Sequence, residues 1–167
     1  MMNSRSIVPA VPADAPALTA IAHAAKRHWG YSEEMIRRWS DTLTLTPGYI
    51  AHSAVFAARA GEEGAIAGFH ALAFVDGSVQ LDHLWVLPSA MGKGIGRALF
   101  QHAEQHAREH GAHRLWVESD PHAEGFYRHM GLTRFGRVPA PIDCEPGRVL
   151  PLLEKRLEPG SNPLPSS

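Results

Sequence analysis

Apolar and polar positions follow a helical period at the start of the chain. Between Asp14 and Gly30 the apolar residues recur every three or four positions, which predicts a helix that Asp14 caps and Gly30 ends. A second helix is predicted from Ser32, because Glu33 and Glu34 follow this capping residue. The positions that would face a core are Leu18, Ile21, Ala22, Ala25, Met35, Ile36 and Trp39.

Most of the remaining chain alternates between strand-like and helical patterns. Strands are predicted over residues 6–10, 52–59, 65–75, 78–87, 114–119, 132–138 and 148–157. Asp76-Gly77 between two of them is a strong signal for a tight hairpin. Helices fit residues 96–110 and residues 123–130, the second closed by Gly131. Antiparallel hairpins followed by a strand-helix-strand crossover predict an α/β (α+β) domain with a mixed sheet.

Composition narrows the class of protein. With 167 residues, an apolar fraction of 44% and a charged fraction of 20%, the chain resembles one globular domain. We expect this domain at residues 1–157 and a flexible tail at residues 158–167. A net charge of −1 favours neither nucleic acid nor an anionic membrane as a partner. The single Cys144, the lack of a long apolar run and the lack of a signal peptide pattern favour a cytoplasmic protein.

A glycine-rich turn between a predicted strand and a predicted helix suits a phosphate group. Gly92, Gly94 and Gly96 let the backbone approach a ligand, and the following helix adds unpaired amides and the positive end of its dipole. A P-loop would need Ser or Thr after Lys93, where Gly94 stands, and the glycine spacing also fails a dinucleotide fingerprint. A pyrophosphate site of the CoA type and a purely structural helix start are the alternatives that remain.

A second motif, Asp120 to Leu132, follows one strand later. Together the two segments resemble the GNAT superfamily of N-acetyltransferases, whose members carry V-x-P, Q/R-x-x-G-x-G/A and N-x-x-A-x-x-F/L-Y-x-x-x-G-F. The matching residues are Val86, Leu87, Pro88, Gly94, Ile95, Gly96, Ala123, Phe126, Tyr127, Gly131 and Leu132. The resemblance implies acetyl-CoA as cosubstrate and a twisted, mixed sheet whose two central parallel strands splay apart around it.

The resemblance also assigns residues to acetyl-CoA, with the pantetheine arm beside the strand end and the pyrophosphate on the amides of the turn. These residues are Leu84, Val86, Leu87, Met91, Gly92, Lys93, Gly94, Ile95, Gly96, Arg97, Asp120, Ala123 and Phe126. Three positions depart from the family pattern. Met91 replaces Gln or Arg, Asp120 replaces Asn, and Gln80 falls where many members carry a glutamate as general base.

Acetyl transfer to an amine needs a proton for the leaving thiolate and a neutral amine. Tyr127 is expected to donate the proton, because a phenol stays protonated at neutral pH. Asp82 is the first choice for the base, since a strand turns it to the same face as Gln80. His83, Glu118, a water chain, or an acceptor that needs no protein base are the alternatives. A further alternative is a non-catalytic module of this fold that binds acyl-CoA without turnover, because glutamine at position 80 cannot take a proton.

The acceptor is less defined than the cofactor. Trp29, Tyr31 and Trp39 cluster around the first two predicted helices, which often form one wall of the acceptor site in the family. An aromatic acceptor pocket and ordinary core packing are equally compatible with this cluster. The charged residues in or beside the late Pro-rich loop are expected to be solvated: Asp143, Glu145 and Arg148. We expect the acceptor to be a primary amine of a small molecule, amino acid or peptide. The resemblance also allows a second copy of the chain as a partner, in a homodimer formed through the late strands.

Histidines recur on the long predicted helix at positions 102, 106 and 110. Adjacent pairs could bind a cation, but His106 and His110 fall beside the apolar stripe, and no carboxylate or cysteine completes a set. We therefore predict no metal site.

Overall fold

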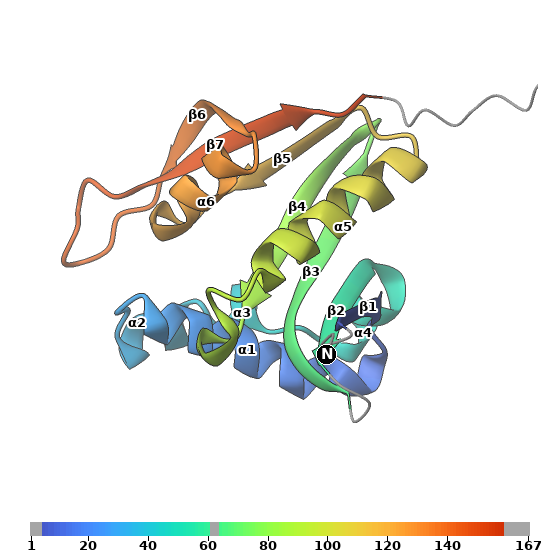
Figure 1. Ribbon diagram of the computed structural model, residues 1–167. Coiled ribbons are helices and arrows are strands. Elements are labelled where there is room, and N and C mark those ends of the chain that lie inside the picture. Colours follow the sequence, from blue (N-terminus) through green and yellow to red (C-terminus); the bar gives the residue numbers. More distant parts are fainter. Residues whose placement is uncertain (1–4, 61–63, 159–167) are drawn as a thin grey trace, which may run out of the picture. The chain divides into compact units, whose positions relative to one another are not determined.

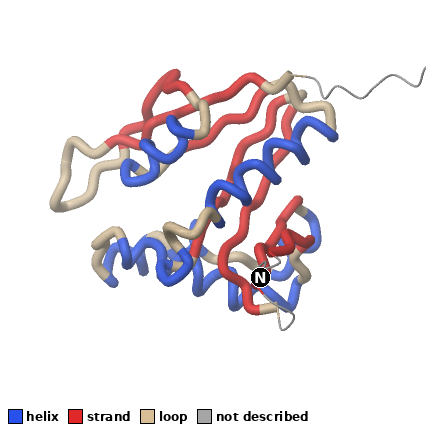
Figure 2. The backbone as a smooth tube through the Cα atoms, viewed as in Figure 1, coloured by secondary structure: helices blue, strands red, loops and turns tan. Residues whose placement is uncertain are grey.

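The computed structural model describes residues 5–60 and 64–158, which form two compact units (Figure 1). The first unit lies within Met1–Leu72 and His83–His102, and the second within Ala73–Asp82 and Ala103–Ser167. Seven strands follow the hydrogen-bonded order β1-β2-β3-β4-β5-β7-β6, and Figure 2 shows the helices that flank them. The predicted mixed α/β fold is confirmed. Residues 61–63, between two of the predicted strands, and residues 159–167 of the predicted tail lie outside the described residues.

Antiparallel strands dominate the first unit. β1 (Arg5–Pro9) pairs with β2 (Ala54–Ala60), and β2 pairs with β3 (Ala65–Val75). β4 (Ser78–Val86) begins in the second unit and ends in the first. These bounds agree with the predicted strands to within two residues, because alternating apolar positions mark them locally.

Four α-helices lie between β1 and β2 along the chain. α1 (Ala15–His28) and α2 (Glu33–Arg38) form as predicted, and the Ser32 hydroxyl caps α2 by accepting the third N–H of its first turn at 3.2 Å. α3 (Ser40–Leu43) and α4 (Pro47–His52) were not predicted. Each is a turn or so long, which is too short for a helical period to show in the sequence.

Asp14 does not cap α1 with its side chain, contrary to the prediction. It ends a short 3-10 helix, η1 (Pro12–Asp14), and its carboxylate accepts the N–H of Val11 and a guanidinium N–H of Arg59, both at 2.9 Å. Arg59 lies on β2, so the competing partner could not be seen from the residues around the helix start.

The core of the first unit lies between α1 and the sheet. It consists of buried apolar residues from the helices, their connections and the strands: Ala15, Leu18, Ile21, Leu45, Ile50, Val55, Ala57, Phe69 and Ala71. Burial of these side chains fixes α1 against β2 and β3.

Parallel and antiparallel pairing meet in the second unit. β4 pairs with β5 (Arg114–Glu118) in parallel over three residue pairs, from Ser78–Arg114 to Gln80–Trp116. β5 then pairs antiparallel with β7 (Val149–Arg156), and β7 with β6 (Thr133–Pro139). The predicted crossover and the predicted final strand pair are both confirmed.

Two helices and a hairpin complete the second unit. α5 (Ile95–Glu109) starts in the first unit and ends in the second, while η3 (Pro121–Ala123) leads directly into α6 (Glu124–His129). The predicted hairpin is present, with φ of 47° at Asp76 and 79° at Gly77, as a two-residue turn of the primed type requires. Within the described residues, no helix is long and apolar enough to cross a membrane.

Candidate functional site

The turn between β4 and α5 is shaped by two glycines. After η2 (Pro88–Ala90), Gly92 and Gly94 have φ of 79° and 80°, a region that favours glycine. A Cβ built on Gly92 meets no atom within 4 Å, and Gly92, Lys93 and Gly94 are exposed. The N–H of Ala98 donates to the Gly94 carbonyl at 3.0 Å. The N–H groups of the residues just before Ala98 have no acceptor within the helix, because no turn of the helix precedes them. Exposed amides at the positive end of a 15-residue helix fit the pyrophosphate of acetyl-CoA.

The end of β4 lies unusually close to β3. The N–H of Leu87 donates to the carbonyl of Ala67 at 2.8 Å. A Cβ on Gly68 would lie 2.7 Å from the carbonyl oxygen of Trp85, so only glycine permits this approach. The apolar residues expected beside the pantetheine arm are half-buried at this strand end: Leu84, Val86 and Leu87.

The predicted aromatic wall of the first unit surrounds a lysine. Lys26, in the last turn of α1, is buried with 8% of its surface exposed. Its ammonium lies 4.7 Å from the ring centroid of Trp39 and 4.9 Å from that of Tyr31. Trp85 and Trp29 follow at 5.5 and 5.8 Å. The structure thus brings the three predicted aromatic residues together and adds Trp85 from β4. We call these four rings the aromatic box.

Tyr127 lies in α6 of the second unit and is buried, with 5% of its surface exposed. Burial raises the pKa of its phenol well above the usual value, and the carboxylate of Asp120 raises it further. The hydroxyl is therefore protonated at neutral pH. A proton donor must be in this state before it can act.

Asp120 is fixed by three groups. Its Oδ1 accepts the N–H of His122 and lies 2.9 Å from the Nδ1 of the same residue. Its Oδ2 accepts an N–H of Arg148 at 3.4 Å, and the two side chains are 6% and 4% exposed. The expectation that Arg148 is solvated was therefore wrong, because the buried carboxylate draws the guanidinium inward. Asp143 and Glu145 are exposed.

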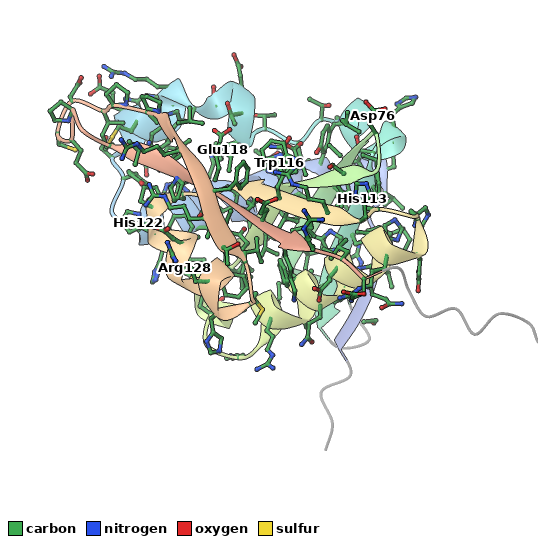
Figure 3. All side chains as sticks on the ribbon, turned by 90° about the horizontal axis from the view of Figure 1, so that it is seen from above. Asp76, His113, Trp116, Glu118, His122 and Arg128 are labelled. Atoms are coloured by element: carbon green, nitrogen blue, oxygen red, sulfur yellow. The ribbon has the colours of Figure 1, made fainter. Side chains whose placement is uncertain are left out.

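Gln80, which falls where many members of the family carry a glutamate, lies on β4. Gln80 and Asp82 alternate with buried Val79 and Leu81, so both lie on the same face of the strand, and Asp82 is exposed. Glu118, another candidate for the general base, is the last residue of β5, two residues beyond Trp116, and is also exposed (Figure 3).

His83 is poorly placed to act as a base. Its Nδ1 accepts the indole N–H of Trp85 at 3.0 Å, so a neutral His83 carries its own proton on Nε2. Taking up a second proton would break the bond to Trp85. This hydrogen bond instead fixes the orientation of one ring of the aromatic box.

The three helical histidines do not act as a set. His102 is hydrogen-bonded to His70 at 2.9 Å in the first unit, whereas the tilted rings of His106 and His110 lie with centroids 4.1 Å apart in the second. Across residues 5–60 and 64–158, no group of three or more His, Cys, Asp or Glu side chains could hold a metal ion.

Comparison with known proteins then identifies the family. The model of the Acetyltransferase (GNAT) family matches residues 17–132, which include the glycine turn, Asp120 and Tyr127. This chain belongs to the GNAT acetyltransferase family.

Relatives and solved structures of GNAT proteins agree with this fold. A streptothricin acetyltransferase from Streptomyces lavendulae is 39% identical over 102 residues, which cover 58% of this chain and 53% of that protein. The chain therefore matches about half the length of this relative. The structure of a PaiA N-acetyltransferase from Thermoplasma acidophilum with coenzyme A has a TM-score of 0.73 over 92% of this chain and 99% of that chain, at 19% identity. A nourseothricin acetyltransferase is 31% identical with a TM-score of 0.56 over 64% of this chain and 66% of that chain.

Sequence reasoning missed Lys26, Trp85 and His122 of this GNAT protein. Lys26 and Trp29 are three residues apart at the end of a helix, a spacing that places them on one side and could have suggested the pair. Trp85 directly precedes the first family motif, and His122 lies within the second. Nothing in those motifs shows what either side chain contacts in the folded chain.

Proposed function

We propose that this GNAT protein moves an acetyl group from acetyl-CoA to a primary amine of a small molecule, amino acid or peptide, by direct transfer within a ternary complex. The observation that carries this proposal is Tyr127, a buried phenol that is held protonated at the motif position of the family. A phenol that stays protonated at neutral pH can donate its proton as negative charge develops on the leaving thiolate.

The cofactor would be held by the glycine turn and the end of β4. The amides from Met91 to Arg97 would bind the pyrophosphate, and the half-buried apolar side chains around Val86 would line the pantetheine arm. When bound, acetyl-CoA supplies the activated thioester. Backbone N–H groups near Val86 would polarise its carbonyl. In the second unit, Asp120, Ala123 and Phe126 are proposed as further contacts of the cofactor.

Two side chains are proposed to handle protons. Tyr127 would hold a proton on Oη and donate it as negative charge develops on the leaving sulfur. Asp82 would take the proton that the acceptor's ammonium loses, because its carboxylate is exposed on the face where the family's glutamate would stand. Glutamine at position 80 can hydrogen-bond to an acceptor but cannot take its proton.

The glycine turn can be tested by binding alone. Gly92→Ala places a side chain at φ 79°, which costs about 1–2 kcal/mol, so we expect the free turn to relax to another conformation. Acetyl-CoA would then have to restore the strained turn and should bind roughly tenfold more weakly by calorimetry. Gly48→Ala is the matched control, because its Cβ also meets open space but its φ is not positive. Equal affinity of both variants would show that the turn does not hold the cofactor.

Gln80 favours one rival, a module that binds acyl-CoA without turnover. The deciding experiment follows thiol release from acetyl-CoA across amines, amino acids, aminoglycosides, short peptides and streptothricin, the last because a relative is named for it. The enzyme predicts release that depends on the acceptor. Tight acetyl-CoA binding without release for any acceptor would support the rival instead.

A further inference from the structure

A buried ion pair of the second unit connects α5 with β7. Glu104 of α5 has 11% of its side chain exposed, and its Oε2 lies 2.6 Å from the ammonium of Lys155 on β7. Arg108, one turn further along α5, lies 3.3 Å from the same oxygen. Glutamate is rarely buried unless it is paired, and here both partners are cations. The proposed function gives this ion pair no role.

Lys155 also contacts the end of α6. Its ammonium donates to the carbonyl of Met130, the C-cap residue of α6, at 3.1 Å. Carbonyls at this end of a helix have no partner within it, and the helix dipole is negative there, so a cation is favoured. A Cβ on the next residue, Gly131, would lie 3.3 Å from the same ammonium. The lysine therefore lies against the backbone of this turn and joins it to α5 and β7.

The backbone of Tyr127 belongs to the same turn. The N–H of Leu132 donates to the carbonyl of Tyr127 at 3.0 Å, and the N–H of Gly131 donates to that of Arg128 at 3.0 Å. This pattern closes a helix on a glycine with positive φ, here 97°. α6 has only six residues, far fewer than an isolated helix needs to be stable in water. The position of Tyr127 therefore depends on contacts from outside α6, and Lys155 supplies one of them.

We infer that Lys155 is a positioning residue for acetyl transfer: its ammonium fixes the end of α6 and thereby holds Tyr127 where it can donate its proton to the leaving sulfur. The inference rests on the proposed function, in which Tyr127 is the donor. In this role Lys155 transfers no proton and needs no contact with either substrate. Glu104 holds the ammonium in place, and the bond to the Met130 carbonyl carries the effect.

Lys155→Met tests this role, because it keeps a long side chain on β7 and removes the ammonium. With saturating acceptor, we expect thiol release from acetyl-CoA to fall about tenfold or more, since a displaced donor acts less well. The KM for acetyl-CoA should stay close to wild type. Arg108→Met is the matched control: it removes the other cation beside Glu104 without touching Met130 and should keep the wild-type rate. A wild-type rate for Lys155→Met would overturn the inference.

A second variant separates the rate from stability. Lys155→Met leaves the buried Glu104 carboxylate with one cation fewer, which destabilises the fold, and adding Glu104→Gln removes this charge. We expect the double variant to be more stable but as slow as Lys155→Met. Glu104→Gln alone keeps the bond from Lys155 to Met130 and should release thiol at nearly the wild-type rate. A double variant with the wild-type rate would show that the loss came from stability, which overturns the inference.

Chemical restoration of the ammonium provides a rescue. The exposed Cys144 is first replaced by serine, and Lys155→Cys is then alkylated with bromoethylamine, to which a side chain with 28% exposure is accessible. The product has the length of lysine and carries an ammonium, so most of the lost rate should return. A fully alkylated protein that is folded but as slow as before would contradict the role of the ammonium.

The dependence on Tyr127 is measured in the Tyr127→Phe background. Here Lys155→Met should cause no further loss of rate, because no donor is left to position. Loss by the same factor in both backgrounds would show a structural role that does not act through Tyr127, and would overturn the inference.

A measurement without turnover distinguishes failure of this inference from failure of the proposed function. The chain has three tyrosines, and with a carbon-13 label at the phenol carbon the NMR signal of Tyr127 is the one missing from Tyr127→Phe. Lys155→Met, with and without Glu104→Gln, should move or broaden this signal at neutral pH, whereas Arg108→Met should not. An unchanged signal overturns the inference. A signal that moves as expected, in a protein that releases no thiol with any acceptor, counts against the proposed function alone.

Discussion

Lys26 and Arg148 are both buried cations, but the molecule surrounds them differently. Lys26 lies 4.7 to 5.8 Å from the centroids of four aromatic rings, whereas Arg148 faces the carboxylate of Asp120 at 3.4 Å. If the guanidinium of Arg148 is removed, a buried negative charge remains beside Tyr127. The ion pair is therefore suited to a fixed structure around the proposed proton donor, whereas the contacts of Lys26 with the rings are those of a cation with neutral groups.

The largest expected effect comes from breaking the ion pair. Arg148→Met leaves the Asp120 carboxylate buried without its guanidinium, and we expect the free energy of unfolding to fall by about 3–5 kcal/mol in urea denaturation. Adding Asp120→Asn removes the stranded charge and should restore part of the loss. A double variant no more stable than Arg148→Met would show that charge is not the cause.

A smaller effect is expected from the aromatic box. Lys26→Met removes the contacts between the cation and the four rings, and the thioether can pack on the rings instead, so we expect the loss of these contacts to lower the free energy of unfolding by about 1 kcal/mol. The same denaturation experiment measures this change. A loss as large as that of Arg148→Met would contradict the distinction between the two sites.

The effect of Tyr127 is absent at neutral pH and appears only at high pH. Burial, and then Asp120, raise the pKa of this phenol in the folded protein above its value in the unfolded chain. The stabilisation is fully present below about pH 10, the unfolded value, and is lost as pH rises toward the folded pKa, because the unfolded chain loses its proton first. The free energy of unfolding should fall by up to about 1.4 kcal/mol per pH unit above pH 10. Tyr127→Phe should flatten this slope; a slope equal to that of wild type would exclude Tyr127 as its source.

The sequence predicted those parts of the fold and site that depend on neighbouring residues. β3 was predicted with its observed bounds, and the turn after β4 was recognised because glycines at fixed spacing leave few alternatives for the backbone. The aromatic wall at Trp29, Tyr31 and Trp39 was also within reach, since the three residues lie close together along the chain.

Contacts between distant parts of the chain could not be predicted in this way. Arg148 meets Asp120 across 28 positions, and Trp85 joins Lys26 across an even longer stretch. No local period marks such pairs, because they depend on how strands and helices pack. Burial of Arg148 and the lysine inside the aromatic box were therefore visible only in the folded structure.

The most direct test of the central claim compares wild type with Tyr127→Phe in acceptor-dependent thiol release from acetyl-CoA, at saturating concentrations of both substrates. The account predicts a fall in rate of ~10²-fold or more, the scale of a lost general acid, while the affinity for acetyl-CoA and the melting temperature at pH 7 stay close to wild type. A variant that releases thiol at the wild-type rate would contradict the role of Tyr127 as proton donor.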